Sequence, residues 1–179
     1  MKDITPPPSL SLEEPRESLF DAFVEMSEDY RRAGEARYQH QDGWDLPRYL
    51  EYLGQLDHWA RGIDLPPNKT PQKTFWLMQD TSAIVGVSRL RLRLNDDLMN
   101  EGGNIGYDVP PSKRRQGFGT ELLRLMLVKA RSLGLDRVFI TCNKDNVGSR
   151  KIIEANGGML DSEGISAKYG KPLLRFWIG

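Results

Sequence analysis

The sequence predicts a mixed α/β fold, in which a mostly antiparallel sheet carries helices on both faces. Three observations lead to this prediction. Two segments with helical periodicity come first, a pair of short apolar strands follows, and the second half alternates strand, helix, strand, helix and strand. At 179 residues the chain suits one domain, residues 1–179, with a helix pair at 18–61 and a sheet-forming core at 74–179.

The N-terminal third is predicted to be helical after a Pro- and Glu-rich start, in which one short strand is expected near Ile4. A first helix begins at Ser18 and fades near Gly34. A second runs from 46 to 61, and Asp45 is its expected N-cap. The apolar stripe expected on the second helix consists of Leu46, Leu50, Leu53, Leu56 and Ala60.

The middle of the chain predicts a hairpin of two strands, residues 74–78 and 84–94. The end of the second strand alternates between two residue types, which places one set inward and the other outward. The inward set is Leu90, Leu92 and Leu94, and the outward set is Arg89, Arg91 and Arg93. These arginines are interpreted as a solvated strand face, with an acidic acceptor as the minority interpretation.

The second half predicts a short strand at 104–109 and a helix at 120–133, which Gly134 ends as a C-cap. A buried strand at 136–142, a capped helix within 145–158 and a last strand at 172–179 complete the order.

The composition excludes several classes of function. Lys and Arg total 25, as do Asp and Glu, so the net charge is zero and neither nucleic acid nor a membrane is expected as a partner. One cysteine, Cys142, and two histidines, His40 and His58, cannot form a disulfide or a zinc ligand set. No metal is therefore predicted. Without an apolar leader or span, the expected location is cytoplasmic.

The stretch "VPPSKRRQGFGTELLRLML", residues 109–127, carries the clearest chemical signal. Two prolines end a strand, three cations follow, and Gly117 and Gly119 leave the backbone bare where a helix begins. The first turn of a helix offers free N–H groups and the positive end of the helix dipole. This pattern predicts a diphosphate site. It matches neither the P-loop nor the dinucleotide glycine motif.

This loop resembles the coenzyme A loop of the GNAT superfamily of acyl-CoA-dependent N-acetyltransferases. Arg114, Gly117 and Gly119 occupy the loop positions. A second block, after the next strand, matches the family pattern with Asn146, Ser149, Ile152–Ile153 and Gly157. The chain is also similar to a bacterial subgroup of predicted acetyltransferases. The resemblance implies a GNAT-like fold whose sheet splays between two central parallel strands, with pantetheine in the gap.

The resemblance implies acetyl-CoA as the co-substrate. The residues expected to bind it are Asp108, Val109, Arg114, Arg115, Gln116, Gly117, Phe118, Gly119, Thr120, Asn146 and Ser149. Two of these have a structural alternative, because Asn is a favoured N-cap and the serine falls in the first turn of a helix.

Catalytic residues are less clearly indicated. Many family members carry a tyrosine acid at the position of Ile153, so another group must serve here. Tyr107 is the candidate acid, although it also suits a core position. Glu101 is a candidate base and Asn104 could orient a water.

The predicted function is therefore transfer of an acetyl group from acetyl-CoA to a primary amine, by direct attack in a ternary complex. The alternatives are a non-catalytic acyl-CoA sensor and an ordinary nucleotide-binding protein. The acceptor is a small-molecule or peptide amine, and a homodimer is possible through C-terminal edge strands. The acceptor pocket is expected between the 38–44 loop, the Pro-rich stretch before Thr74 and a hairpin around Tyr169; Tyr38, Trp44 and Trp76 are candidate lining residues.

Overall fold

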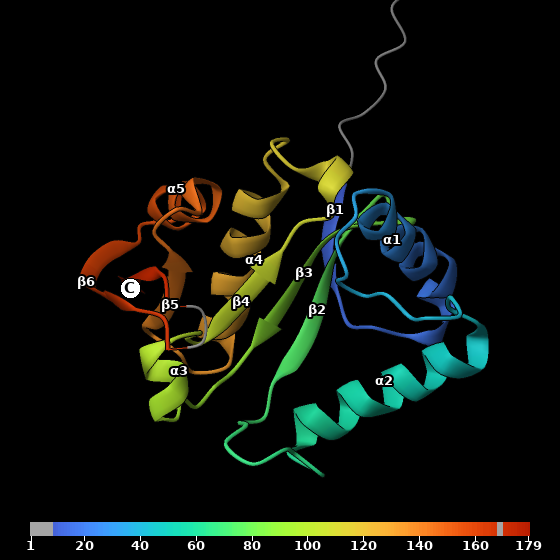
Figure 1. Cartoon of the computed structure of the whole chain (residues 1–179), viewed down its shortest axis with the longest axis horizontal. Helices are drawn as coiled ribbons and strands as arrows, with labels where there is room; N and C mark the ends of the chain where they lie inside the picture. Colours follow the sequence, from blue (N-terminus) through green and yellow to red (C-terminus); the bar gives the residue numbers. More distant parts are fainter. Residues whose placement is uncertain (1–8, 168–169) are drawn as a thin grey trace, which may run out of the picture.

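The computed structural model describes residues 9–167 and 170–179, so Ile4 and Tyr169 lie outside the described residues. Its strands form two antiparallel sheets with helices packed around them (Figure 1). The mixed, mostly antiparallel α/β fold predicted from the sequence is confirmed.

The first sheet has the strand order β1-β2-β3-β4. Its strands are β1 (Leu10–Glu13), β2 (Lys73–Gln79), β3 (Ala83–Leu90) and β4 (Ile105–Asp108). The central strand β2 has five consecutive buried residues, 74–78, because helices cover both faces of the sheet. β2 and β3 form the predicted hairpin.

The second sheet has the order β5-β7-β6. It contains β5 (Val138–Asn143), β6 (Met159–Ile165) and β7 (Pro172–Ile178), with β7 in the centre.

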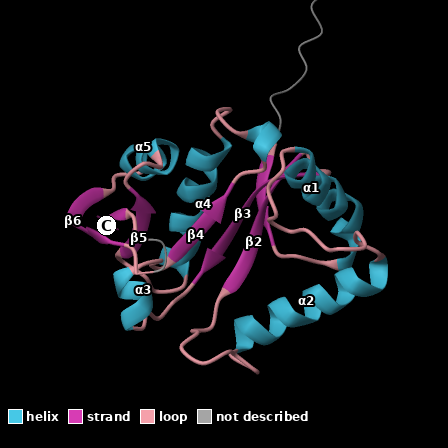
Figure 2. Ribbon diagram, in the orientation of Figure 1, coloured by secondary structure: helices cyan, strands magenta, loops and turns pink. Residues whose placement is uncertain are grey.

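The helices form two hydrophobic layers on opposite faces of the first sheet (Figure 2). α1 (Phe20–Arg32) and α2 (Leu46–Arg61) pack on one face, around the fully buried Phe23, Tyr49 and Trp76. α4 (Phe118–Ser132) packs on the other face and extends the core toward the second sheet. α5 (Val147–Ala155) packs against α4 and β5, and the short α3 (Asp96–Asn100) precedes β4. Short 3₁₀ turns lie at Glu17–Leu19 and Pro111–Lys113.

The two sheets meet at one point, between β4 and β5. An isolated bridge joins Gly103 to Ile140, and the amide of Asn104 donates to the carbonyl of Phe139 at 2.7 Å. Beyond this joint β4 and β5 belong to separate sheets, although the two strands run in the same general direction in Figure 1. The splay implied by the family resemblance is thus present, and it opens toward the start of α4.

Glycine is required at this joint. Gly103 has a φ of +78°, and a Cβ built on it would lie 2.2 Å from the carbonyl oxygen of Phe139. The backbones of the two sheets therefore approach more closely than any other residue allows.

Two expectations about packing were wrong, one about the end of β3 and one about α2. β3 ends at Leu90, so Leu92 lies in a bend and is 47% exposed instead of pointing inward. On α2, Leu46 and Leu50 are 39% and 41% exposed, because the helix buries Tyr49 and Leu56 instead. The prediction assigned the buried face from the leucines alone, whereas the aromatic side chain of Tyr49 has a larger apolar area to bury.

The N-cap of α2 was predicted correctly, since Asp45 accepts from the amide of Arg48 at 3.0 Å. Gly62, which was not predicted as a cap, ends the helix at a φ of +75°. α3 and β1 were not predicted, and β6 was expected only as the partner of the last strand in a C-terminal hairpin. Within the described part of the chain, no helix has the length and apolar character needed to span a membrane.

Candidate functional site

A cleft of about 560 Å³ opens at the splay, between the end of β4, the start of α4 and the start of α5. Most of the predicted coenzyme-binding residues line it, and Gln116 and Phe118 do not. The amide side chain of Gln116 donates to the carbonyl of Ser112, and Phe118 packs against the core. The lining residues are Glu35, Arg37, Tyr107, Asp108, Val109, Arg114, Arg115, Gly117, Gly119, Thr120, Asn146, Gly148, Ser149, Lys151 and Ile152.

The loop before α4 presents backbone amides to this cleft. Arg115 and Gly117 both adopt left-handed backbone conformations, with φ values of +61° and +87°. Gly117 is the N-cap of α4 and makes no side-chain capping bond, so the first-turn amides are left for a ligand. The first backbone bond of the helix runs from Glu121 to the Gly117 carbonyl at 3.1 Å. Successive free amides at the positive end of a helix form an anion site.

The two loop glycines have different roles, which the sequence did not distinguish. A Cβ on Gly117 would meet nothing within 4 Å, so its side is open to a ligand. A Cβ on Gly119 would lie 2.6 Å from the Cδ1 atom of Ile152 and 3.4 Å from the Cγ2 atom of Val109. Gly119 is therefore needed to pack α4 against α5.

The rim of the cleft carries four cations. Arg114 is held by Glu35 through two hydrogen bonds of 2.6 and 2.8 Å, and its Nε donates to the Val109 carbonyl at 3.0 Å. The hydrogen bond from Arg114 lowers the pKa of Glu35. Arg115 and Lys151 are exposed and have no acidic partner among the described residues. These two cations, together with Arg37, are the ones best placed to meet an anionic ligand at the rim.

The edge of β4 leaves backbone groups directed into the splay. The Arg91 amide donates to the Asn104 carbonyl at 2.8 Å, and the register pairs Gly106 with Arg89 and Asp108 with Val87. Because hydrogen bonding alternates along an antiparallel strand, the backbones of Tyr107 and Val109 face the gap instead. Asp108, predicted as a ligand of coenzyme A, has its backbone paired with β3.

The side chain of Tyr107 lies in the cleft, next to α5. Its hydroxyl is 2.8 Å from the Oγ atom of Ser149. Burial raises the pKa of Tyr107, so the phenol stays protonated at neutral pH and keeps a hydrogen to donate. Burial also raises the pKa of the nearby Cys142 thiol.

Asn146 acts as the helix cap that the sequence left open as an alternative. Its Oδ1 accepts from the Ser149 amide at 3.0 Å, at the start of α5. The residue also lines the cleft, so one side chain shapes both features.

Asn104 holds the sheets together. It is 4% exposed; its Nδ2 donates to the Arg91 carbonyl at 2.9 Å, and its Oδ1 accepts from the Phe139 amide at 2.8 Å. Both ends of the side chain are thus engaged with backbone. This geometry favours a structural role over the predicted orientation of a water.

Asp108 is the centre of a polar cluster that the sequence did not reveal. Its carboxylate accepts from Tyr30 at 2.7 Å, from Tyr38 at 3.0 Å, and from Arg37 and Arg89 at 2.9 Å each. Burial and the Asp108 charge raise the pKa of both tyrosines. The partners lie 19 to 78 residues away in the chain, which is why no local pattern indicated them.

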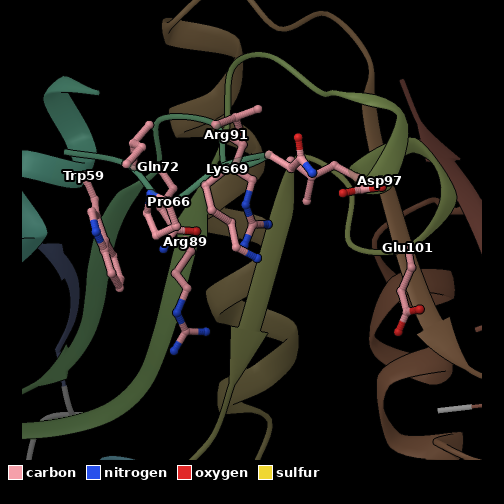
Figure 3. Close-up of a pocket in the computed structure, with 12 residues that line it drawn as sticks. Trp59, Pro66, Lys69, Gln72, Arg89, Arg91, Asp97 and Glu101 are labelled. Atoms are coloured by element: carbon pink, nitrogen blue, oxygen red, sulfur yellow. The ribbon is translucent and has the colours of Figure 1, made fainter. Parts of the chain in front are cut away.

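Arg89 connects this cluster to a second cleft, of about 350 Å³ (Figure 3). The Pro-rich stretch before Thr74, which was predicted to be a wall of the acceptor pocket, lines this cleft, whereas Tyr38, Trp44 and Trp76 do not. Trp76 is fully buried and stacks on Phe23. Glu101, the candidate base, lies in this cleft. The lining residues are Trp59, Leu65, Pro66, Asn68, Lys69, Thr70, Gln72, Arg89, Arg91, Asp97, Leu98 and Glu101.

Two antiparallel sheets that splay beside a glycine loop at a helix N-terminus define the N-acyltransferase class of α/β folds. A family model described as "Acetyltransferase (GNAT) domain" matches residues 9–159. The chain belongs to this family. No curated protein matches the sequence.

Solved structures show the same fold at low sequence identity. RimJ of Mycobacterium smegmatis, in complex with CoA-disulfide, is 17% identical with a TM-score of 0.68, over 94% of this chain and 81% of RimJ. An acetyltransferase of Salmonella typhimurium that modifies the N-terminal serine of ribosomal protein L7/L12 is 20% identical, with a TM-score of 0.64 over 94% of both chains. The microcin C7 self-immunity acetyltransferase MccE, in complex with acetyl-CoA and AMP, is 13% identical with a TM-score of 0.64, over 94% of this chain and 91% of MccE.

Proposed function

We propose that the protein transfers an acetyl group from acetyl-CoA to a primary amine, by direct attack of the amine in a ternary complex. The observation that carries the proposal is the cleft at the splay, where the open side of Gly117 and the free amides of the α4 first turn adjoin an unpaired edge of β4. Family members of the same fold are solved with acetyl-CoA or coenzyme A bound.

The residues of the cleft suit the parts of this co-substrate. The amides from Arg115 to Thr120 would hold the pyrophosphate, with Arg115 and Lys151 adding charge. The backbone of Tyr107 and Val109 would bond the pantetheine and polarise the thioester carbonyl. Acetyl-CoA supplies the activated acyl group; the protein orients it, excludes water and stabilises developing charge.

Proton handling is divided between the two clefts. In the transfer, the amine nitrogen bonds the acetyl carbon, the carbon–sulfur bond breaks, and the amine gives up a proton. Glu101, on the side of the second cleft, is the group that would accept this proton, directly or through water. Tyr107 would donate a hydrogen bond to the leaving sulfur, which then takes its proton from water.

Replacing Tyr107 by phenylalanine tests this role. We expect kcat to fall by about 10- to 30-fold, the value of one hydrogen bond to a charged group, while the Kd for acetyl-CoA stays within about twofold. Steady-state kinetics and calorimetry measure the two quantities. An unchanged kcat would remove Tyr107 from the mechanism, and a parallel loss of binding would indicate a packing role.

A non-catalytic acyl-CoA sensor is the second candidate. It is favoured by Ile153, which is fully buried at the position where many family members carry a tyrosine acid. A sensor would bind acetyl-CoA and release no thiol with any amine.

Thermal unfolding with acetyl-CoA, CoA, ATP and NAD at matched concentrations tests the proposed function. A ligand at 100 times its Kd adds about 2.7 kcal/mol, which for a chain of this length raises Tm by about 5–10 °C. We expect this shift with acetyl-CoA and CoA alone, followed by thiol release when amines are added. An equal shift with ATP, or none with CoA, contradicts the proposal.

The acceptor and the assembly remain predictions. A structural neighbour that modifies the N-terminal serine of a ribosomal protein supports a protein amino terminus as one candidate acceptor, beside small amines. The predicted homodimer would use β6, an edge strand on which Met159 and Ile165 are 68% and 64% exposed.

A further inference from the structure

The second cleft has a cationic side whose charge is only partly neutralised. Arg89 is paired with Asp108 at 2.9 Å, a carboxylate that it shares with Arg37. Arg91 is half-buried, and its Nη1 donates a hydrogen bond to the Gly103 carbonyl at 3.2 Å. No carboxylate contacts Arg91 among residues 9–167 and 170–179. Lys69 lies on the same side and also lacks an acidic partner in the described chain.

Burying a guanidinium without a carboxylate partner costs free energy, so buried arginines are normally ion-paired. Burial, followed by the nearby charge of Arg89, holds the pKa of Arg91 below its usual value. The partly buried and unpaired guanidinium of Arg91 is therefore suited to bind a negatively charged group of a ligand.

The opposite side of the same cleft is acidic. Asp97 lies on α3 and Glu101 directly follows it, and Figure 3 shows both across the cleft from Arg91 and Lys69. Glu101 accepts a hydrogen bond from Ser166 at 2.7 Å. No ion pair within the described structure joins the two sides, so the opposite charges face the same space without neutralising each other.

A ligand that satisfies both sides must itself carry both charges. We propose that the acceptor is a compact zwitterion, namely a primary amine with a carboxylate or phosphate a few bonds away. This inference rests on the proposed function and specifies its substrate. The ammonium group would lie toward Glu101 and the anion toward Arg91. The volume of about 350 Å³ is at the small end of ligand pockets, which suits an amino acid or the first residues of a peptide.

The experiment compares acceptors in matched pairs that differ only in the anion. One pair is free L-alanine and L-alaninamide, and another is a tetrapeptide amide with Asp or Asn at its second position. kcat/KM is measured for wild type, Arg91→Gln and Arg91→Lys. Arg93→Gln is the matched control, because Arg93 is an exposed arginine of the same segment that does not line the cleft.

We expect wild type to prefer the anionic member of at least one pair by about tenfold or more, the value of a charge-assisted hydrogen bond. Arg91→Gln should abolish this preference without changing the Kd for acetyl-CoA, Arg91→Lys should restore part of it, and Arg93→Gln should keep it. The pair that shows the preference identifies the source as a free amino acid or a peptide. Equal rates within both pairs, or a preference that survives Arg91→Gln, would overturn the proposal.

Anion binding tests the cleft without turnover. With the protein saturated by CoA, so that the loop at Gly117 is occupied, inorganic phosphate should raise the Tm of wild type above that in chloride of equal ionic strength. Arg91→Gln should show no such rise. An identical response of the two proteins refutes the inference even if acetyl-CoA binds; failure of acetyl-CoA to bind refutes the proposed function instead, and phosphate without CoA then still tests Arg91.

Discussion

Gly117→Glu is expected to weaken acetyl-CoA binding by at least about 100-fold, or about 2.7 kcal/mol. The new carboxylate would stand among the free amides of the α4 N-terminus, where it both fills the ligand position and repels a diphosphate. Nothing lies within 4 Å of the added Cβ, so the fold should survive. Calorimetric titration with acetyl-CoA, beside a thermal unfolding curve, measures both properties.

Gly134→Glu is the matched control. Gly134 follows the other end of α4 at a φ of +89°, close to the +87° of Gly117, and its Cβ position is equally open. Each substitution forces a residue with a side chain to adopt a left-handed backbone conformation, at a cost of about 1–2 kcal/mol. If the two variants lose stability equally but only Gly117→Glu loses binding, the loop assignment stands. Equal binding by both variants would disprove it.

Gly119→Glu would be a poorer test of the loop than Gly117→Glu. Both glycines belong to the same motif, yet only Gly119 lies against Ile152 and Val109. A side chain there would separate α4 from α5, so a loss of binding would not distinguish a blocked ligand site from damaged packing.

Gly103→Ala is expected to destabilise the protein by at least about 3 kcal/mol, which lowers Tm by about 6–12 °C. The added Cβ would lie 2.2 Å from the Phe139 carbonyl oxygen, so the two sheets must separate at their single joint. The hydrogen bonds between Asn104 and Phe139 would be strained by the same movement. Chemical denaturation gives the change in the free energy of unfolding.

Gly43→Ala controls for backbone strain alone. Gly43 has a φ of +77°, against +78° for Gly103, and nothing lies within 4 Å of its Cβ position. We expect it to cost about 1–2 kcal/mol. A similar loss in both variants would show that the joint tolerates a methyl group. A larger loss in Gly103→Ala, with weaker acetyl-CoA binding, would link the joint to the shape of the cleft.

The local elements and the glycine loop before α4 were predictable because their determinants lie within a few residues. Asp45 and Gly62 bound α2, two prolines end β4, and Gly117 begins α4. These features depend on caps, φ preferences and missing donors, which a short window of sequence contains. The family resemblance then supplied the position of the splay, between the strand before the loop and the strand after it.

The tertiary structure decided what contacts what across the chain. Asp108 was expected to bind coenzyme A, yet its carboxylate collects tyrosines and arginines from three distant segments. Arg89 and Arg91 were expected to share a solvated face, yet Arg89 is ion-paired with a carboxylate and Arg91 is not. Periodicity assigns a side chain to a face of a strand, but a charge is balanced or left unbalanced only by segments that folding brings beside it. For that physical reason the sequence by itself determined the fold class and the glycine loop that we propose binds the coenzyme, and only the packed structure determined the charge balance of the second cleft.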